Sequence, residues 1–128
     1  MKYLVDTHLL IWTVFDSAKL PNRAKKILEE DDGEYYFSAA SVWEIALKRQ
    51  KHPERFPFTA TAARDLFLAA GFIEQAVSSK HSAAVEDLPH IHGDPFDRIL
   101  VVQAQCDGMK LLTHDRMIVQ YGDVAVEV

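Results

Sequence analysis

The first twelve residues, MKYLVDTHLLIW (1–12), contain the transition that decides the fold. Lys2 to Val5 have the composition of a buried strand, Asp6 follows, and an apolar helical stretch begins at His8. An acid at the end of a core strand can cap the next helix, bind a metal ion or act as a nucleophile. The rest of the sequence is needed to distinguish among these roles of Asp6.

Strands and helices continue to alternate along the chain. Further strands are expected in YYFSA (35–39), FIEQAV (72–77), MKLLT (109–113) and VAVEV (124–128). Helices are expected in PNRAKKILEEDD (21–32, with Pro21 at the first helical position), SVWEIALKRQ (41–50), TATAARDLFLAAG (59–71), a segment from the Ser78 or Ser79 cap to Val85, and DPFDRILVVQAQCDG (94–108). This alternation predicts an α/β fold, a three-layer α/β/α sandwich with a central, mostly parallel sheet of four or five strands.

Length and composition limit the class of protein. With 128 residues, the chain is expected to form one domain over residues 1–128, and 48% hydrophobic with 26% charged content is typical of a globular protein. No apolar run approaches the roughly 18 to 20 residues of a membrane span, so the sequence predicts a cytoplasmic protein without membrane contact. The net charge of −5 argues against binding nucleic acid by charge alone.

Acidic residues recur where predicted strands give way to helices. A structural explanation exists for each one, because helix starts favour such residues. Asp6 can cap the first helix, and Asp115 can cap RMIVQ (116–120). Ser41 and Glu44 have the spacing of a capping box, and Asp94 and Asp97 fit the cap and the first turn of the 94–108 helix.

The acids are more informative as a set. In a parallel sheet, the strand ends before Asp6 and Asp115 and the helix starts near Glu44 and Asp97 share one edge. Carboxylates brought that close repel one another unless a cation lies among them. Carboxylates without cysteine suit Mg²⁺ or Mn²⁺, and such ions can activate water for attack on a phosphodiester. The set therefore predicts nuclease chemistry.

Four stretches, YLVDTHLLIW, SAASVWEIALK, HGDPFDRILVVQA and LLTHD, occur in the order and spacing of a PIN-domain ribonuclease. Over essentially its whole length the chain resembles the VapC-like toxins of bacterial type II toxin–antitoxin modules. In this resemblance Asp6, Glu44, Asp97 and Asp115 match the four acids that hold the metal and carry catalysis. Asp94 precedes the third acid by three residues and is the alternative to Asp97 at that position.

The resemblance also implies a function and partners. It implies Mg²⁺- or Mn²⁺-dependent cleavage of RNA, a homodimer, and neutralisation by a small antitoxin protein. Thr7 and Thr113 match small polar residues beside the acids, where their hydroxyls could orient a carboxylate or a metal-bound water, or simply cap helices. Candidate RNA contacts are the cations Lys48, Arg49, Lys51, Arg55 and Arg98, of which Arg98 could instead pair with a carboxylate.

Other classes fit the sequence less well. His90, His92 and Asp94 open an H-x-H-x-D zinc-hydrolase pattern, but Pro95 stands where the next histidine would be. Asp6 could form a phosphoaspartate in another phosphoesterase, although His8 replaces the second acid of the usual D-x-D pair. The remaining alternative is a catalytically inactive PIN-like module that binds RNA or protein, which would have no reason to keep four repelling acids.

Overall fold

The computed structural model describes residues 1–128. Its strands are β1 (Lys2–Val5), β2 (Glu34–Ser38), β3 (Ile73–Gln75), β4 (Lys110–Thr113) and β5 (Ala125–Glu127). Its α-helices are α1 (Thr7–Phe15), α2 (Asn22–Leu28), α3 (Ala39–Lys51), α4 (Ala60–Ala69), α5 (Ser79–Ala84), α6 (Pro95–Asp107) and α7 (Arg116–Val119). Short 3-10 turns lie at Ser17–Lys19 and Val85–Asp87. None of the helices is long and apolar enough to cross a membrane.

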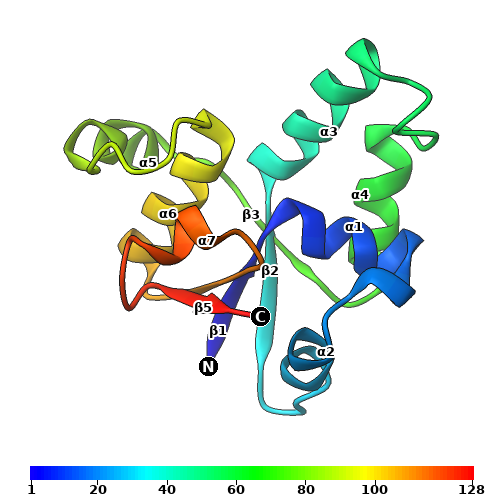
Figure 1. The fold of residues 1–128 in the computed structure, drawn as a ribbon, viewed down its shortest axis with the longest axis horizontal. Coiled ribbons are helices and arrows are strands. Elements are labelled where there is room, and N and C mark those ends of the chain that lie inside the picture. The colour runs from blue at the N-terminus through cyan, green and yellow to red at the C-terminus, as the bar shows by residue number, and fades with distance from the viewer.

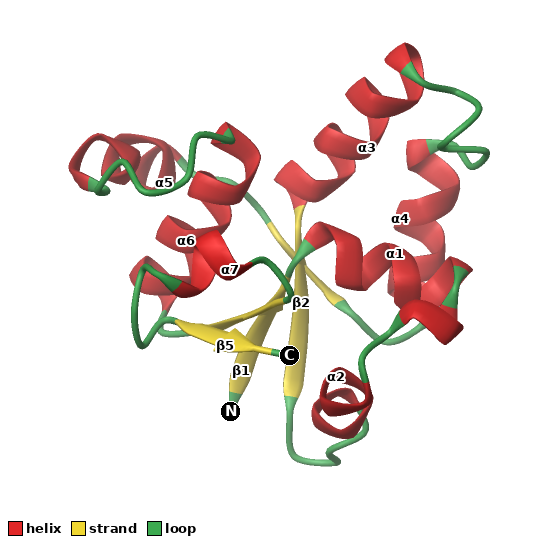
Figure 2. Cartoon of the chain, in the orientation of Figure 1, coloured by secondary structure: helices red, strands yellow, loops and turns green.

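The five strands form one sheet in the order β3-β2-β1-β4-β5, and every neighbouring pair is parallel. Helices α1 to α4 lie on one side of the sheet, and α5 to α7 lie on the other (Figure 1). The predicted α/β/α sandwich with a parallel sheet is confirmed, and Figure 2 shows the strands between the two groups of helices.

Each face of the sheet is packed into its own apolar cluster. In β1, Tyr3 and Val5 belong to the cluster with α1 and α4, whereas Leu4 belongs to the cluster with α6. This follows from the period of two in a strand, where successive side chains point to opposite faces. A strand covered on both sides has no solvated face, which explains why Tyr3, Leu4 and Val5 follow one another in β1 and are all buried.

The position of β1 defines where a ligand would bind. From β1 the chain winds to β2 and β3 on one side, and it then crosses to β4 and β5 on the other side. In such doubly wound sheets the helices diverge where the winding reverses, and a crevice opens at the carboxyl ends of the strands. The crevice of this fold therefore lies beyond the ends of β1 and β4.

Two predicted helix starts are wrong in detail. Pro21 is the cap of α2 rather than its first helical residue. Helix α3 begins at Ala39, and the Ser38 hydroxyl caps it by accepting the backbone N–H of Ala40. Glu44 therefore lies in the second turn of α3, so Ser41 and Glu44 do not form a capping box.

Candidate metal centre

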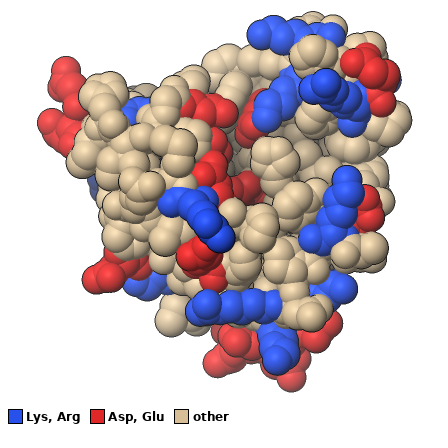
Figure 3. Space-filling model, viewed as in Figure 1, with Lys and Arg blue, Asp and Glu red and all other residues tan.

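The predicted acids come from four places in the chain. Asp6 follows β1, Glu44 lies inside α3, Asp97 is in the first turn of α6, and Asp115 caps α7 after β4. All four lie toward the carboxyl edge of the sheet, where the two groups of helices separate. Acidic side chains gather in a hollow in the middle of this face, with lysine and arginine side chains around it (Figure 3).

Asp6 is almost completely buried, with 4% of its surface exposed. Its Oδ1 accepts the backbone N–H of His8 at 2.9 Å, and its Oδ2 accepts the Thr113 hydroxyl at 2.7 Å. Burial raises the pKa of Asp6 above its ordinary value, although these hydrogen bonds oppose the shift. Thr113 also accepts the backbone N–H of Asp115 at 3.0 Å, so one hydroxyl links the acids that follow β1 and β4.

Glu44 is also buried, with 2% exposure. Its Oε2 pairs with the Lys48 ammonium one turn later in α3, at 2.5 Å. Its Oε1 is buried without a hydrogen-bond partner. A buried carboxylate oxygen without a donor carries the full cost of its lost hydration, so this oxygen is available to a cation.

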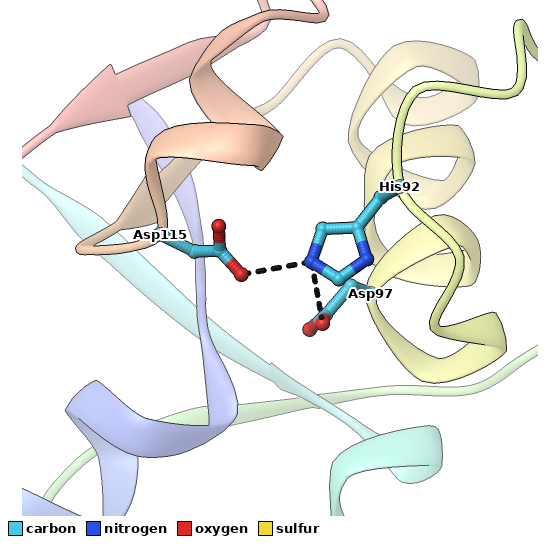
Figure 4. Close-up of side chains that lie close together, drawn as sticks. All are labelled: His92, Asp97 and Asp115. Atoms are coloured by element: carbon cyan, nitrogen blue, oxygen red, sulfur yellow. Dashed lines mark hydrogen bonds and ion pairs between the residues drawn. The ribbon is translucent and has the colours of Figure 1, made fainter.

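Asp97 and Asp115 meet around a histidine. The Nε2 of His92 lies 3.2 Å from Oδ2 of Asp97 and 2.8 Å from Oδ2 of Asp115 (Figure 4). One ligand atom from each of these three residues lies within 4.8 Å of the other two. The sequence did not indicate His92 as part of the acidic site, although it lies two residues before Asp94 in the HGDPFD stretch.

The charges of the acids act on one another. Burial raises the pKa of Asp97 to about 7, and the negative charges of Asp6, Asp94 and Glu44 contribute to this shift. Burial alone would lower the pKa of His92, but its hydrogen bond to Asp115 and the surrounding carboxylates raise it overall. Burial alone would raise the pKa of Asp115, but the His92 contact and the α7 backbone N–H groups lower it overall. The cluster therefore has a surplus of negative charge that a proton or a metal ion can offset.

Two residues near the acids have defined structural contacts. Asp94 Oδ1 caps α6 by accepting the backbone N–H of Phe96 at 2.8 Å. The Thr7 hydroxyl donates to the Ser41 hydroxyl at 2.8 Å, which joins α1 to α3. Among the polar residues beside the acids, Thr113 thus contacts a carboxylate directly and Thr7 does not.

The predicted RNA contacts fall into two groups. Lys48 pairs with Glu44, Arg49 donates to the Phe56 carbonyl, and Lys51 and Arg55 are exposed. Arg98, by contrast, is 7% exposed, and its guanidinium donates to the carbonyls of Pro89 at 3.0 Å and Leu88 at 3.2 Å. Arg98 therefore holds the segment before α6 in place, and its guanidinium has carbonyl partners rather than a carboxylate and little surface open to a phosphate.

Residues 3–124 match the family profile described as PIN domain. The chain belongs to the PIN domain family. The match includes the elements that carry Asp6, Glu44, Asp97 and Asp115. No curated protein sequence is significantly similar to this PIN domain.

Solved structures share the fold of this PIN domain. VapBC2 from Rickettsia felis, bound to a DNA fragment from its promoter, superposes with a TM-score of 0.73 at 14% identity, covering 100% of this chain and 98% of the other. A toxin–antitoxin complex from Klebsiella pneumoniae superposes with a TM-score of 0.64 at 19% identity, and the match covers 98% of this chain and 99% of the other. FitAcB from Neisseria gonorrhoeae superposes with a TM-score of 0.61 at 18% identity, and the match covers 98% of this chain and 96% of the other.

The raised pKa of Asp97 predicts that the metal-free PIN domain loses stability as the pH rises. Between about pH 4 and pH 7 the folded protein keeps a proton on Asp97 that the unfolded chain has released, so the free energy of unfolding falls with pH. The raised pKa of His92 acts in the same direction. Asp97 alone accounts for a loss of about 2 kcal/mol between pH 5 and pH 8.

Urea unfolding at pH 5 and pH 8 in EDTA measures this change. Added Mg²⁺ is expected to restore most stability at pH 8, where the carboxylates are charged. A metal-free protein that is more stable at pH 8 than at pH 5 would contradict the assignment of the pKa of Asp97.

Proposed function

We propose that residues 1–128 form a single PIN domain that cleaves RNA with Mg²⁺ or Mn²⁺ as the toxin of a type II toxin–antitoxin module. The observation that carries the proposal is the unpartnered Oε1 of Glu44, a buried acid whose charge acts on the equally buried Asp6. Without a cation, this arrangement combines carboxylate repulsion with an unsatisfied oxygen. Membership of the PIN domain family supports the nuclease activity.

The donor set fits a hard divalent ion. Asp6, Glu44, Asp97 and Asp115 would hold it, since they offer carboxylate oxygens from four elements at one edge of the sheet. Asp94 would support the site from outside, because its carboxylate caps α6. When bound, Mg²⁺ or Mn²⁺ supplies Lewis-acid activation of water and neutralises charge on the phosphodiester.

The residues of the chain prepare the site for this chemistry. Thr113 fixes the orientation of Asp6 through a 2.7 Å hydrogen bond. Burial of Asp6 and Glu44 excludes water from the base of the cluster and strengthens its electrostatic interactions. In the metal-free protein the pKa of Asp97 is about 7, so this carboxyl group can exchange its proton for a metal ion near neutral pH.

RNA would lie across the hollow and along the end of α3. Lys51 and Arg55 are exposed there and can contact backbone phosphates. Arg49 follows Lys48 in the same basic segment, although one of its nitrogens already donates to the Phe56 carbonyl. Lys48 is next to the acids through its pair with Glu44, so it would lie nearest the scissile phosphate.

Two protein partners complete the proposal. The structures from Klebsiella pneumoniae, Rickettsia felis and Neisseria gonorrhoeae share the fold, and the Klebsiella structure is a toxin–antitoxin complex, which supports an antitoxin partner in the cytoplasm. A second copy of the chain would cover Trp43, which is 62% exposed and packs edge-to-face on Phe96 with ring centroids 5.0 Å apart. Both rings border a largely apolar cavity of about 550 Å³, as expected for a surface that another chain covers.

Cleavage of a mixed RNA pool by purified, antitoxin-free protein tests the proposed activity. We expect cleavage with Mg²⁺ or Mn²⁺ and none in EDTA, with fragment ends that reveal any sequence preference. Metal binding in calorimetry without cleavage of any RNA class, including structured tRNA and rRNA, would instead favour an inactive PIN-like binding module. Cleavage that persists in EDTA would contradict the role of the metal.

A further inference from the structure

His92 lies where two elements of the proposed metal site meet. Its Nε2 approaches Asp97, from the first turn of α6, and Asp115, from the turn after β4. The imidazole is 12% exposed, so it is enclosed between the two carboxylates (Figure 4). The ring is therefore the side chain that lies between these two acids.

The other ring nitrogen determines which atom carries the proton. His92 Nδ1 accepts the backbone N–H of Asp94 at 3.0 Å, and a nitrogen that accepts an N–H has no hydrogen of its own. In the neutral ring the hydrogen is therefore on Nε2, which is directed at Asp97 and Asp115. His92 consequently donates this N–H to Asp115, and the Asp97 carboxylate lies 3.2 Å from the same nitrogen.

The segment that carries His92 is held from several sides. The backbone N–H of His92 donates to the Tyr121 hydroxyl at 2.9 Å, and that hydroxyl donates to the Pro89 carbonyl at 3.0 Å. The buried Arg98 guanidinium also donates to the Pro89 carbonyl. A ring that is fixed in this way can impose a position on the flexible carboxylates that it contacts.

We propose that His92 is a positioning residue that holds Asp115 through its Nε2–H at the side of Asp97, so that one divalent ion can use both carboxylates. This inference rests on the proposed metal site and adds a residue outside the four acids. His92 is not itself a ligand in this arrangement, because its unprotonated nitrogen is turned toward the Asp94 backbone. Hydrogen bonds to ligating groups typically raise metal affinity by about 10- to 100-fold.

The tautomer of His92 can be measured without relying on activity. Long-range ¹H–¹⁵N spectra of protein labelled with ¹⁵N-histidine distinguish a protonated Nε2 from a protonated Nδ1. At a pH high enough for the ring to be neutral, we expect the Nε2–H form in EDTA and in saturating Mg²⁺. A hydrogen on Nδ1, or an Nε2 signal that becomes metal-bound when Mg²⁺ is added, would overturn the assignment and make His92 a ligand.

Two substitutions separate hydrogen bonding from packing. His92→Phe keeps a ring but removes the N–H, whereas His92→Gln keeps an N–H at a similar distance from the backbone. In Mn²⁺ titration calorimetry, we expect His92→Phe to weaken binding by about 10- to 100-fold and His92→Gln to remain within about threefold of the unmodified protein. His90→Phe, at an exposed position in the same segment, is the matched control and should bind Mn²⁺ normally.

Cleavage kinetics complete the test, and melting curves establish that each variant is folded. With RNA saturating and Mn²⁺ limiting, His92→Phe should lower kcat more than it changes KM, and His92→Gln should restore most of kcat. Unmodified protein that binds no divalent ion would overturn the proposed function and this inference together. If the unmodified protein binds Mn²⁺ and a folded His92→Phe variant binds it equally well, or more tightly, only the inference is overturned.

Discussion

Asp6→Asn is expected to abolish RNA cleavage while leaving the metal-free protein at least as stable as the unmodified chain. The substitution keeps the shape of the side chain and an oxygen for the N–H of His8, and Thr113 can accept a hydrogen bond where it now donates one. The substitution removes a carboxyl group that is buried and whose pKa burial raises. Metal affinity should fall by at least about 100-fold, the upper end of what an outer hydrogen-bonding partner costs.

Calorimetry with Mn²⁺, cleavage of labelled RNA and thermal melting in EDTA at pH 8 test Asp6→Asn together. Asp16→Asn is the matched control, because the Asp16 carboxylate is 46% exposed and pairs with Lys19 near the end of α1. The control should keep full activity. A large fall in the melting temperature of metal-free Asp6→Asn would show that the carboxylate serves mainly as the cap of α1.

Glu44→Gln is expected to have a comparable effect on activity for a different reason. Oε1 of Glu44 is buried without a donor, and Oε2 is neutralised by Lys48, so this carboxylate is poised for a cation. Glutamine has nearly the same volume, but it has one oxygen and no charge to offer. We expect the fold to be retained, Mn²⁺ affinity to fall by at least about 100-fold, and cleavage to be lost with it.

Circular dichroism and Mn²⁺ titration separate the two contributions of Glu44. Glu54→Gln is a suitable control, since the Glu54 side chain is 69% exposed in the loop after α3. Unchanged metal affinity in a well-folded Glu44→Gln protein would mean that Glu44 serves only as the partner of Lys48. The acidic site would then consist of Asp6, Asp97 and Asp115.

Helix capping and metal binding are compatible roles for the acids in this fold. Asp6 and Asp115 each use Oδ1 to cap a helix, and each has an Oδ2 directed at another side chain. A carboxylate has lone pairs in several directions, so a carboxylate that caps a helix can still bind a metal ion through its other lone pairs. The sequence presented these roles as competing interpretations, because a linear pattern does not show the direction of each oxygen.

Local sequence patterns are sufficient to predict the architecture and the edge of the sheet at which the acids lie. The apolar run of β1, the alternation of strands with helices, and the caps at Asp6, Asp94 and Asp115 depend on local propensity and periodicity. A parallel sheet then requires the strand ends to share one edge. From these local signals the sandwich and the edge that carries Asp6, Glu44, Asp97 and Asp115 could be predicted.

Contacts between distant parts of the chain set which side chains lie between the acids. His92 lies between Asp97 and Asp115 because the loop before α6 brings its ring beside the residue that follows β4. Arg98 points inward and donates to the carbonyls of Pro89 and Leu88 in that loop. Glu44 became a buried acid with a free oxygen, not a capping residue, because α3 starts at Ala39. The placement of His92 and Arg98 depends on hydrogen bonds between residues distant in sequence, and the burial of Glu44 depends on how α3 packs, and local patterns encode neither.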